Sequence, residues 1–217
     1  MTTLIIIYAI LVGALTVLDQ RLSLWLKGVI KMTAASCFIG LPIVCFEHLN
    51  TFTLLIFTGL CASWLGDLCL VWPGTGRHFK LGIFAFLLAH FAYAGAFLTQ
   101  PLALQLTLPL LALFLLLGFG VYFKLMPDIP TKLRPPVVVY IIALVAMTAL
   151  AWTLDASDAR FTYGLAATAF LLSDISVALQ RFGTHSQIHR LWGVPLYFGA
   201  QIAFAYLITN QSCGISL

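Results

Sequence analysis

The chain has 217 residues, of which 62% are hydrophobic and 8% are charged, and its formal net charge is +4. A soluble domain of this length needs many more charged residues on its surface. The composition therefore excludes a soluble protein and indicates one integral membrane domain over residues 1–217. Its apolar stretches are continuous instead of alternating, which favours transmembrane helices over a closed β-barrel.

Short polar breaks divide the sequence into apolar stretches close to the ~20 residues that a bilayer requires. Pro73-Gly74 ends the third stretch, and Pro135-Pro136 opens the sixth. We predict an all-α, polytopic membrane protein, a bundle of about eight transmembrane helices. The first is expected to be a retained helix, because no basic segment precedes it. The predicted spans are about 4–18, 22–46, 52–72, 79–99, 102–123, 136–153, 161–180 and 191–209.

The basic residues alternate between loops. Most of them follow odd-numbered spans: Arg21, Arg77, Lys80, Lys124, Lys132, Arg134, Arg181 and Arg190. The positive-inside rule then places the odd-numbered loops in the cytoplasm and both termini on the non-cytoplasmic side. This topology signal accounts for the positive net charge, so no nucleic-acid partner is expected. We expect the inner (plasma) membrane of a bacterium.

Two acidic residues lie deep in apolar stretches. Asp67 follows Leu65-Gly66 in the third span, and Asp174 follows Ser173 in the seventh. Lipid does not solvate an ionised group, so an acid inside a membrane usually faces a partner or a wet cavity. With the orientation above, both aspartates lie in the cytoplasmic third of the membrane, and we predict that they face each other across one pocket.

Other polar residues of the spans gather mainly in the same half of the membrane. Lys27 and Lys31 share one helix face, as do Tyr197 and Gln201. We therefore predict one polar pocket that opens toward the cytoplasm. The predicted binding residues are Lys27, Lys31, His90, Tyr93, Tyr140, Ser173, Tyr197 and Gln201.

The sequence predicts neither a metal site nor a cofactor. Its five cysteines lack the spacing of metal ligands, and only His90 among the histidines lies well inside a span. The cysteines are interpreted as small packing residues. A zinc-dependent hydrolase would need several histidines or thiolates at one depth.

The motifs around the two aspartates resemble those of the YhhN family of lysoplasmalogenases. The matching residues are Leu65-Gly66-Asp67, Phe79, Gly82, Phe86, His90, Tyr93, Ser173-Asp174, Ala178, Phe182, Tyr197 and Gln201. The family's Lys-Pro pair is replaced here by Lys27-Gly28 and Lys31-Met32. The resemblance implies eight spans and hydrolysis of the vinyl ether bond of lysoplasmalogens. The products would be a fatty aldehyde and glycerophosphoethanolamine or glycerophosphocholine.

Two carboxylates suit this chemistry on physical grounds. Cleavage begins when an acid protonates the alkene carbon, and a nearby negative charge then stabilises the oxocarbenium ion. Asp67 and Asp174 can divide these roles, although the sequence does not assign them. A lysine, Lys31 before Lys27, is expected to hold the phosphate of the lysophospholipid. The aliphatic outer half of the membrane domain would hold the alkyl chain.

Other interpretations remain open at the level of sequence. The aspartates could form structural ion pairs with Lys27 or Lys31, and the lysines could extend to the interface. The buried histidine, tyrosines and glutamine could serve packing or interhelical hydrogen bonds. Two other functions fit membrane acids: a proton-coupled transporter of small molecules or lipids, and a non-catalytic lipid-binding protein. The oligomeric state is left open.

Overall fold

The computed structural model describes residues 2–18, 21–44, 46–48, 50–74, 76–155, 157–183 and 186–213. These ranges contain eight α-helices, joined by short loops and 3-10 turns, and one isolated β-bridge between Leu102 and Leu154. The helices are α1 (Thr2–Val17), α2 (Leu24–Ile43), α3 (Thr51–Cys69), α4 (Arg77–Leu98), α5 (Leu104–Leu125), α6 (Arg134–Trp152), α7 (Ser157–Phe182) and α8 (Gln187–Cys213).

The predicted all-α membrane bundle is confirmed, with one difference at its start. In the described ranges, seven helices, α2 to α8, are long and apolar enough to cross a membrane. The apolar part of α1, Ile6–Val17, is shorter. The 16 residues of α1 extend about 24 Å, less than the ~30 Å of a hydrocarbon core. The first predicted span is therefore a short helix that packs on α2 and α8.

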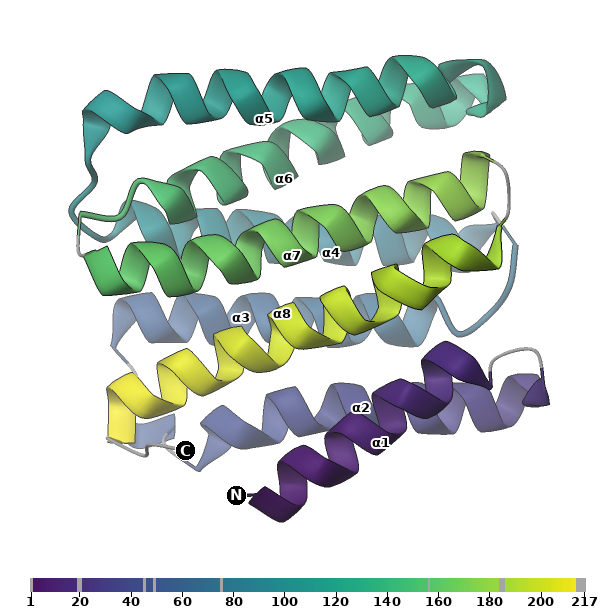
Figure 1. Ribbon diagram of the computed structural model, residues 1–217, viewed down its shortest axis with the longest axis horizontal. Helices are drawn as coiled ribbons and strands as arrows, with labels where there is room; N and C mark the ends of the chain where they lie inside the picture. The colour runs from purple at the N-terminus through teal and green to yellow at the C-terminus, as the bar shows by residue number, and fades with distance from the viewer. Residues whose placement is uncertain are drawn as a thin grey trace.

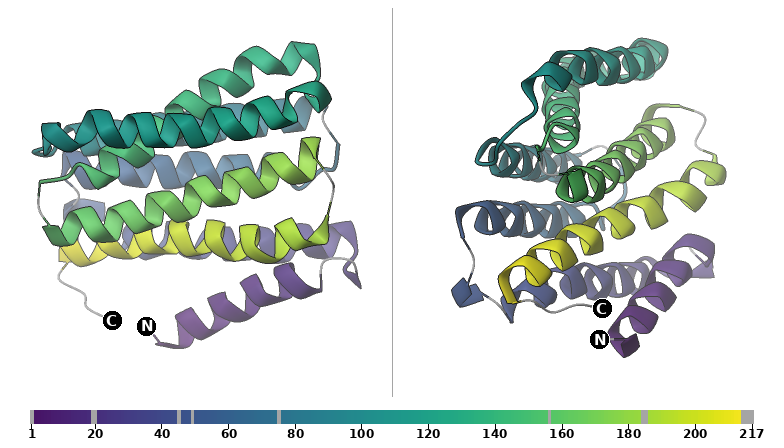
Figure 2. Two further views of the ribbon diagram at one scale, coloured as in Figure 1. Left: turned by 45° about the horizontal axis from the view of Figure 1, so that its top comes forward. Right: turned by 60° about the vertical axis from the view of Figure 1, so that its left-hand side comes forward.

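The helices run alternately up and down, so α1 begins and α8 ends at the same end of the bundle (Figure 1). Helix α3 packs on α4, α7 packs on α8, and α6 contacts α4, α5 and α7. Helix α5 lies at one edge beside α6, and α1 lies at the opposite edge beside α2 (Figure 2). Helices α1, α3, α5 and α7 all end at the other end of the bundle (Figure 1). Most of the basic residues lie near these helix ends, and this end is named the basic end below.

Small residues at helix contacts and large apolar residues on the outer surface suit this packing. Ala35, Ala89 and Ala96 are fully buried, and their small side chains let helices approach closely. On α5, Leu108 and Leu116 are each 75% exposed, as expected of a helix whose outer face meets hydrocarbon.

The ends of the helices follow ordinary capping rules. Ser23 and Asn50 cap the first turns of α2 and α3 by accepting hydrogen bonds from the backbone amides of Leu26 and Thr53. After α3 the chain turns at Gly74, whose φ of +94° is a conformation that favours glycine. This turn returns the chain directly into α4 at the basic end.

The orientation in the membrane is a prediction that reporter fusions test. Because basic residues concentrate in the loops after odd-numbered helices, a fusion at residue 75 is expected to report the cytoplasm and one at residue 155 the opposite side. A phosphatase and a fluorescent reporter at each position give complementary signals. The reverse pattern at both positions would show that the termini are cytoplasmic.

Candidate active site

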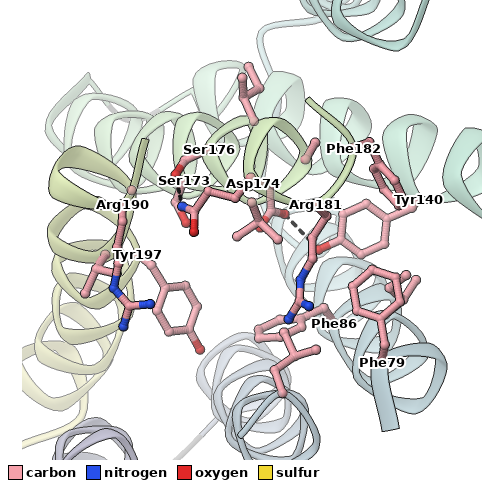
Figure 3. A pocket seen from close by; sticks show the side chains of 18 of the residues that line it. Phe79, Phe86, Tyr140, Ser173, Asp174, Ser176, Arg181, Phe182, Arg190 and Tyr197 are labelled. Atoms are coloured by element: carbon pink, nitrogen blue, oxygen red, sulfur yellow. Dashed lines mark hydrogen bonds between the residues drawn. The ribbon is translucent and has the colours of Figure 1, made fainter. Parts of the chain in front are cut away.

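A cavity of about 520 Å³ lies among the helices at the basic end of the bundle. Helices α2 to α8 all contribute to its wall, and α1 adds Leu15. The wall combines aliphatic and aromatic side chains with a few charged and hydroxyl groups (Figure 3). The charged groups are Lys27, Lys31, Asp67, Asp174, Arg181 and Arg190. A cavity of this kind suits an amphipathic ligand with one apolar and one charged part.

Asp67 of α3 is held by two other helices. Its side chain is 2% exposed, and Lys31 Nζ of α2 lies 3.0 Å from Oδ1. The same ammonium donates a hydrogen bond of 3.2 Å to the backbone carbonyl of Asp67. The Tyr197 hydroxyl of α8 donates to Oδ2 at 2.5 Å. Both carboxylate oxygens therefore have a partner, and the lysine balances the negative charge.

Asp174 of α7 has different surroundings. Its side chain is 14% exposed, and His90 Nε2 lies 3.5 Å from Oδ2. The Tyr140 hydroxyl donates a hydrogen bond of 2.8 Å to the same oxygen (Figure 3). Among the described residues, these are the polar partners of Asp174, and neither is a permanent cation. The two aspartates thus share one cavity but differ in charge compensation.

Close helix contacts bring these side chains together. A side chain at Gly193 of α8 would collide with Ser176 of α7, so glycine allows the two helices to touch. The Ser176 hydroxyl also donates a hydrogen bond of 2.5 Å to the His189 carbonyl. One turn after Gly193, Tyr197 then reaches across to Asp67.

Aromatic rings pack beside the aspartates. Gly66, next to Asp67, leaves room for the ring of Phe86, which a side chain at residue 66 would meet. The Phe86 ring makes edge contacts with Tyr197 at 5.8 Å and Phe170 at 6.3 Å between centroids. These rings form an apolar part of the cavity wall near Asp67.

A second polar network lies deeper in the bundle. Tyr93 donates a hydrogen bond of 2.8 Å to Gln201 Oε1, and Gln201 Nε2 donates to Ser63 Oγ at 3.2 Å. Ser63, Tyr93 and Gln201 are fully buried. This network joins α3, α4 and α8, which is the interhelical role left open by the sequence.

The structure separates the predicted site residues into two groups. Seven line the cavity: Lys27, Lys31, Asp67, Tyr140, Ser173, Asp174 and Tyr197. His90, Tyr93 and Gln201 lie outside its lining, so their positions do not support the predicted contact with substrate. His90 is fully buried between the rings of Tyr140 and Phe170, each 4.9 Å away between centroids. It meets Asp174 instead of the cavity.

Two other expectations take a different form in the structure. Lys31 pairs with Asp67, as in the ion-pair alternative, and its contact with the phosphate stays a prediction. Arg181 and Arg190, which lie between the predicted spans 161–180 and 191–209, belong to α7 and α8 and line the cavity. The sequence did contain a signal for Arg181, because a residue seven positions after Asp174 shares its helix face.

The chain is similar to a known family of membrane proteins. A model of the YhhN family matches residues 26–208, which include most of the cavity wall. Human lysoplasmalogenase TMEM86A is 34% identical over 156 residues, which cover 69% of this chain and 63% of that protein. Bovine lysoplasmalogenase TMEM86A is 32% identical, with the same coverage of each chain. Human lysoplasmalogenase TMEM86B is 30% identical over 185 residues, which cover 85% of this chain and 75% of that protein.

The matches cover most of this chain but a smaller share of some relatives. The chain spans 63% of the length of the TMEM86A relatives. No solved structure matches it. The family model covers well over half of the sequence and includes both aspartate motifs. On this evidence, the chain belongs to the YhhN family.

Proposed function

We propose that this protein is an intramembrane lysoplasmalogenase, which hydrolyses the vinyl ether bond of a lysoplasmalogen. The products are a fatty aldehyde and glycerophosphoethanolamine or glycerophosphocholine. The relatives that bear the name lysoplasmalogenase support this activity. The observation that carries the proposal is one cavity lined by two aspartates, of which only Asp67 has a lysine partner.

The two surroundings suggest a division of roles. Lys31 favours the ionised form of Asp67, so this residue is assigned as the carboxylate. In the part of the chain that the structure describes, Asp174 has no lysine or arginine partner to favour its ionised form, and it is assigned as the proton donor. A protonated acid and a carboxylate in one enclosed site are what oxocarbenium chemistry requires.

The reaction proceeds in three steps. The Asp174 carboxyl gives its proton to the alkene carbon farther from the ether oxygen, and the resulting cation is shared by the other carbon and that oxygen. Water then adds to the cationic carbon and returns one proton to Asp174, which gives a hemiacetal. Finally the bond between this carbon and the glycerol oxygen breaks. The hemiacetal hydroxyl loses its proton as it becomes the aldehyde carbonyl, and the glycerol oxygen gains one, so the proton count is unchanged. Negative carboxylate charge nearby lowers the energy of the cation.

The cavity wall accommodates the apolar part of the substrate. Phe86, Leu144 and Leu171 line it beside the two aspartates, and no charged group is needed to bind an alkenyl chain. Burial of the chain among such side chains stabilises the complex by about 0.8 kcal/mol per methylene. The pocket is expected to open toward the cytoplasm, as the positive-inside rule predicts for the basic end.

An assay of the purified protein tests the proposal directly. The protein in detergent is expected to release fatty aldehyde from a 1-alkenyl lysophosphoethanolamine and no aldehyde from the matched 1-alkyl or 1-acyl lipids. A coupled aldehyde dehydrogenase follows the product. A well-folded protein that releases no aldehyde would contradict the proposal. Coupled proton and solute uptake into vesicles, without aldehyde release, would favour the transporter instead.

Hydrolysis is expected to proceed without a metal ion. Within the part of the chain that the structure describes, no group of three or more His, Cys, Asp or Glu residues could hold one. Aldehyde release should therefore be unchanged after dialysis against a strong chelator. Loss of activity on chelation, followed by recovery when zinc is added, would show that a metal takes part.

A further inference from the structure

We propose that Arg181, together with Arg190, binds the phosphodiester of the lysophospholipid and so places its vinyl ether bond beside Asp174. This inference rests on the proposed function, since it takes an ether lysophospholipid as the ligand. It assigns the anionic part of the ligand to arginines of α7 and α8, and it leaves Lys31 to balance Asp67.

Arg181 has the surroundings of an anion-binding residue. It lies in the last turn of α7 and lines the cavity (Figure 3). Its Nη1 donates a hydrogen bond of 3.2 Å to the Gly74 carbonyl, and its Cζ lies 5.0 Å from the centroid of the Phe79 ring. These contacts hold one edge and one face of the guanidinium. Both partners are neutral, so a ligand anion would supply the missing negative charge.

The spacing along α7 matches the length of the ligand. Arg181 follows Asp174 by seven residues, so the two side chains share a helix face and lie about 10 Å apart along the axis. In a 1-alkenyl lysophospholipid, six single bonds separate the ether-bearing alkene carbon from phosphorus, a distance of about 7 Å when extended. The long arginine side chain can cover the difference. A phosphate at Arg181 therefore brings the reacting carbons within reach of Asp174.

Arg190 adds a second guanidinium from α8. Its Nε and Nη2 lie 3.4 Å from the Leu15 carbonyl, and it also lines the cavity (Figure 3). Guanidinium groups present paired donors that fit two phosphate oxygens. The remaining lysine of the wall, Lys27, lies one turn before Lys31 at the same end of α2. Lys27, Arg181 and Arg190 thus add positive charge to the cavity wall.

Binding of a lipid that cannot be hydrolysed tests this inference. The purified full chain is titrated in detergent with a 1-alkyl lysophosphoethanolamine and with the phosphate-free 1-alkylglycerol. The wild-type protein is expected to bind the phospholipid more tightly. Arg181→Gln should weaken phospholipid binding about tenfold or more and leave alkylglycerol binding unchanged, because it removes a charge-assisted hydrogen bond. Arg181→Lys, which keeps the charge but not the paired donors, should give an intermediate loss.

A matched control removes the same charge elsewhere. Lys80 is an exposed lysine of α4 at the basic end, outside the cavity lining, and Lys80→Gln should leave both affinities unchanged. Wild-type phospholipid affinity in a folded Arg181→Gln protein would overturn the inference, and so would an equal loss for both lipids. Displacement of the lipid by an equal concentration of inorganic phosphate would overturn it in favour of a free-anion site. If the variant does not fold, equal affinity of the wild-type protein for the two lipids would also refute it.

The two proposals fail in different ways. The titration ligand contains no vinyl ether, so its binding does not depend on turnover. A protein that binds it through Arg181 but never releases aldehyde contradicts the proposed function alone. A protein that releases aldehyde with the same KM after Arg181→Gln contradicts the phosphate site alone.

Discussion

Asp174→Asn is expected to reduce kcat for aldehyde release by about 10² or more, because the amide keeps the shape of the side chain but has no acidic proton. Asp67→Asn should cause a loss of similar size by removing the carboxylate. If the two groups act as a unit, the double variant should be little worse than either single variant. Initial rates at saturating 1-alkenyl lysophosphoethanolamine measure the effect.

Folding and charge need separate controls in this series. Asp128→Asn changes an exposed acid in the short turn after α5 and should leave kcat unchanged. Gel filtration and thermal unfolding in detergent show whether each variant keeps the native bundle. Near-wild-type turnover in a folded Asp174→Asn or Asp67→Asn protein would exclude the two-carboxylate mechanism.

Lys31→Met is expected to produce the largest loss of stability among the cavity lysines, about 3 kcal/mol in free energy of unfolding. The change leaves the carboxylate of Asp67, which is 2% exposed, with the Tyr197 hydroxyl but without its cation. The double variant Lys31→Met with Asp67→Asn should recover most of the loss, because no buried charge then remains unpaired. Denaturant unfolding in mixed micelles measures the change in free energy of unfolding for Lys31→Met, for Asp67→Asn and for the double variant.

The recovery in the double variant is the decisive observation. Lys80→Met, at an exposed position of α4, controls for the loss of a positive charge and should change stability by less than about 0.5 kcal/mol. An additive effect of the two substitutions would mean that the 3.0 Å contact between Lys31 and Asp67 contributes nothing specific. Lys31 would then return to its sequence-based interpretation as a phosphate ligand.

The sequence indicated how deep each polar residue lies in the membrane better than it indicated which neighbour its side chain meets. The apolar stretches predicted the helices of the bundle, because continuous hydrophobicity admits few other structures in lipid. The cost of a charge in hydrocarbon singled out Asp67 and Asp174 among the acids, and both line the cavity. Position along a span indicates how deep a residue lies. It does not indicate which neighbouring helix the side chain meets.

The hydrogen-bond partners of the buried tyrosines illustrate this limit. Tyr197 is 130 residues away from Asp67 in sequence, yet its hydroxyl reaches that carboxylate. Tyr93 and Gln201 are also polar residues within spans, but they form a hydrogen bond with each other outside the cavity lining. Tyr197 and Gln201 share one face of α8, but Gln201 lies one turn farther from the basic end. The packing of the neighbouring helices decides which side chains each of them meets at its depth.

By itself, the sequence determined the helical membrane architecture, the family motifs and the two acids, because hydrophobicity and the cost of burying charge act on each segment separately. The tertiary structure decided which charge compensates which. It paired Lys31 with Asp67 and placed Tyr140 and His90 next to Asp174. It also placed Arg181 in the wall of the cavity. Such contacts depend on the relative rotation and spacing of helices distant in sequence, which no single segment encodes.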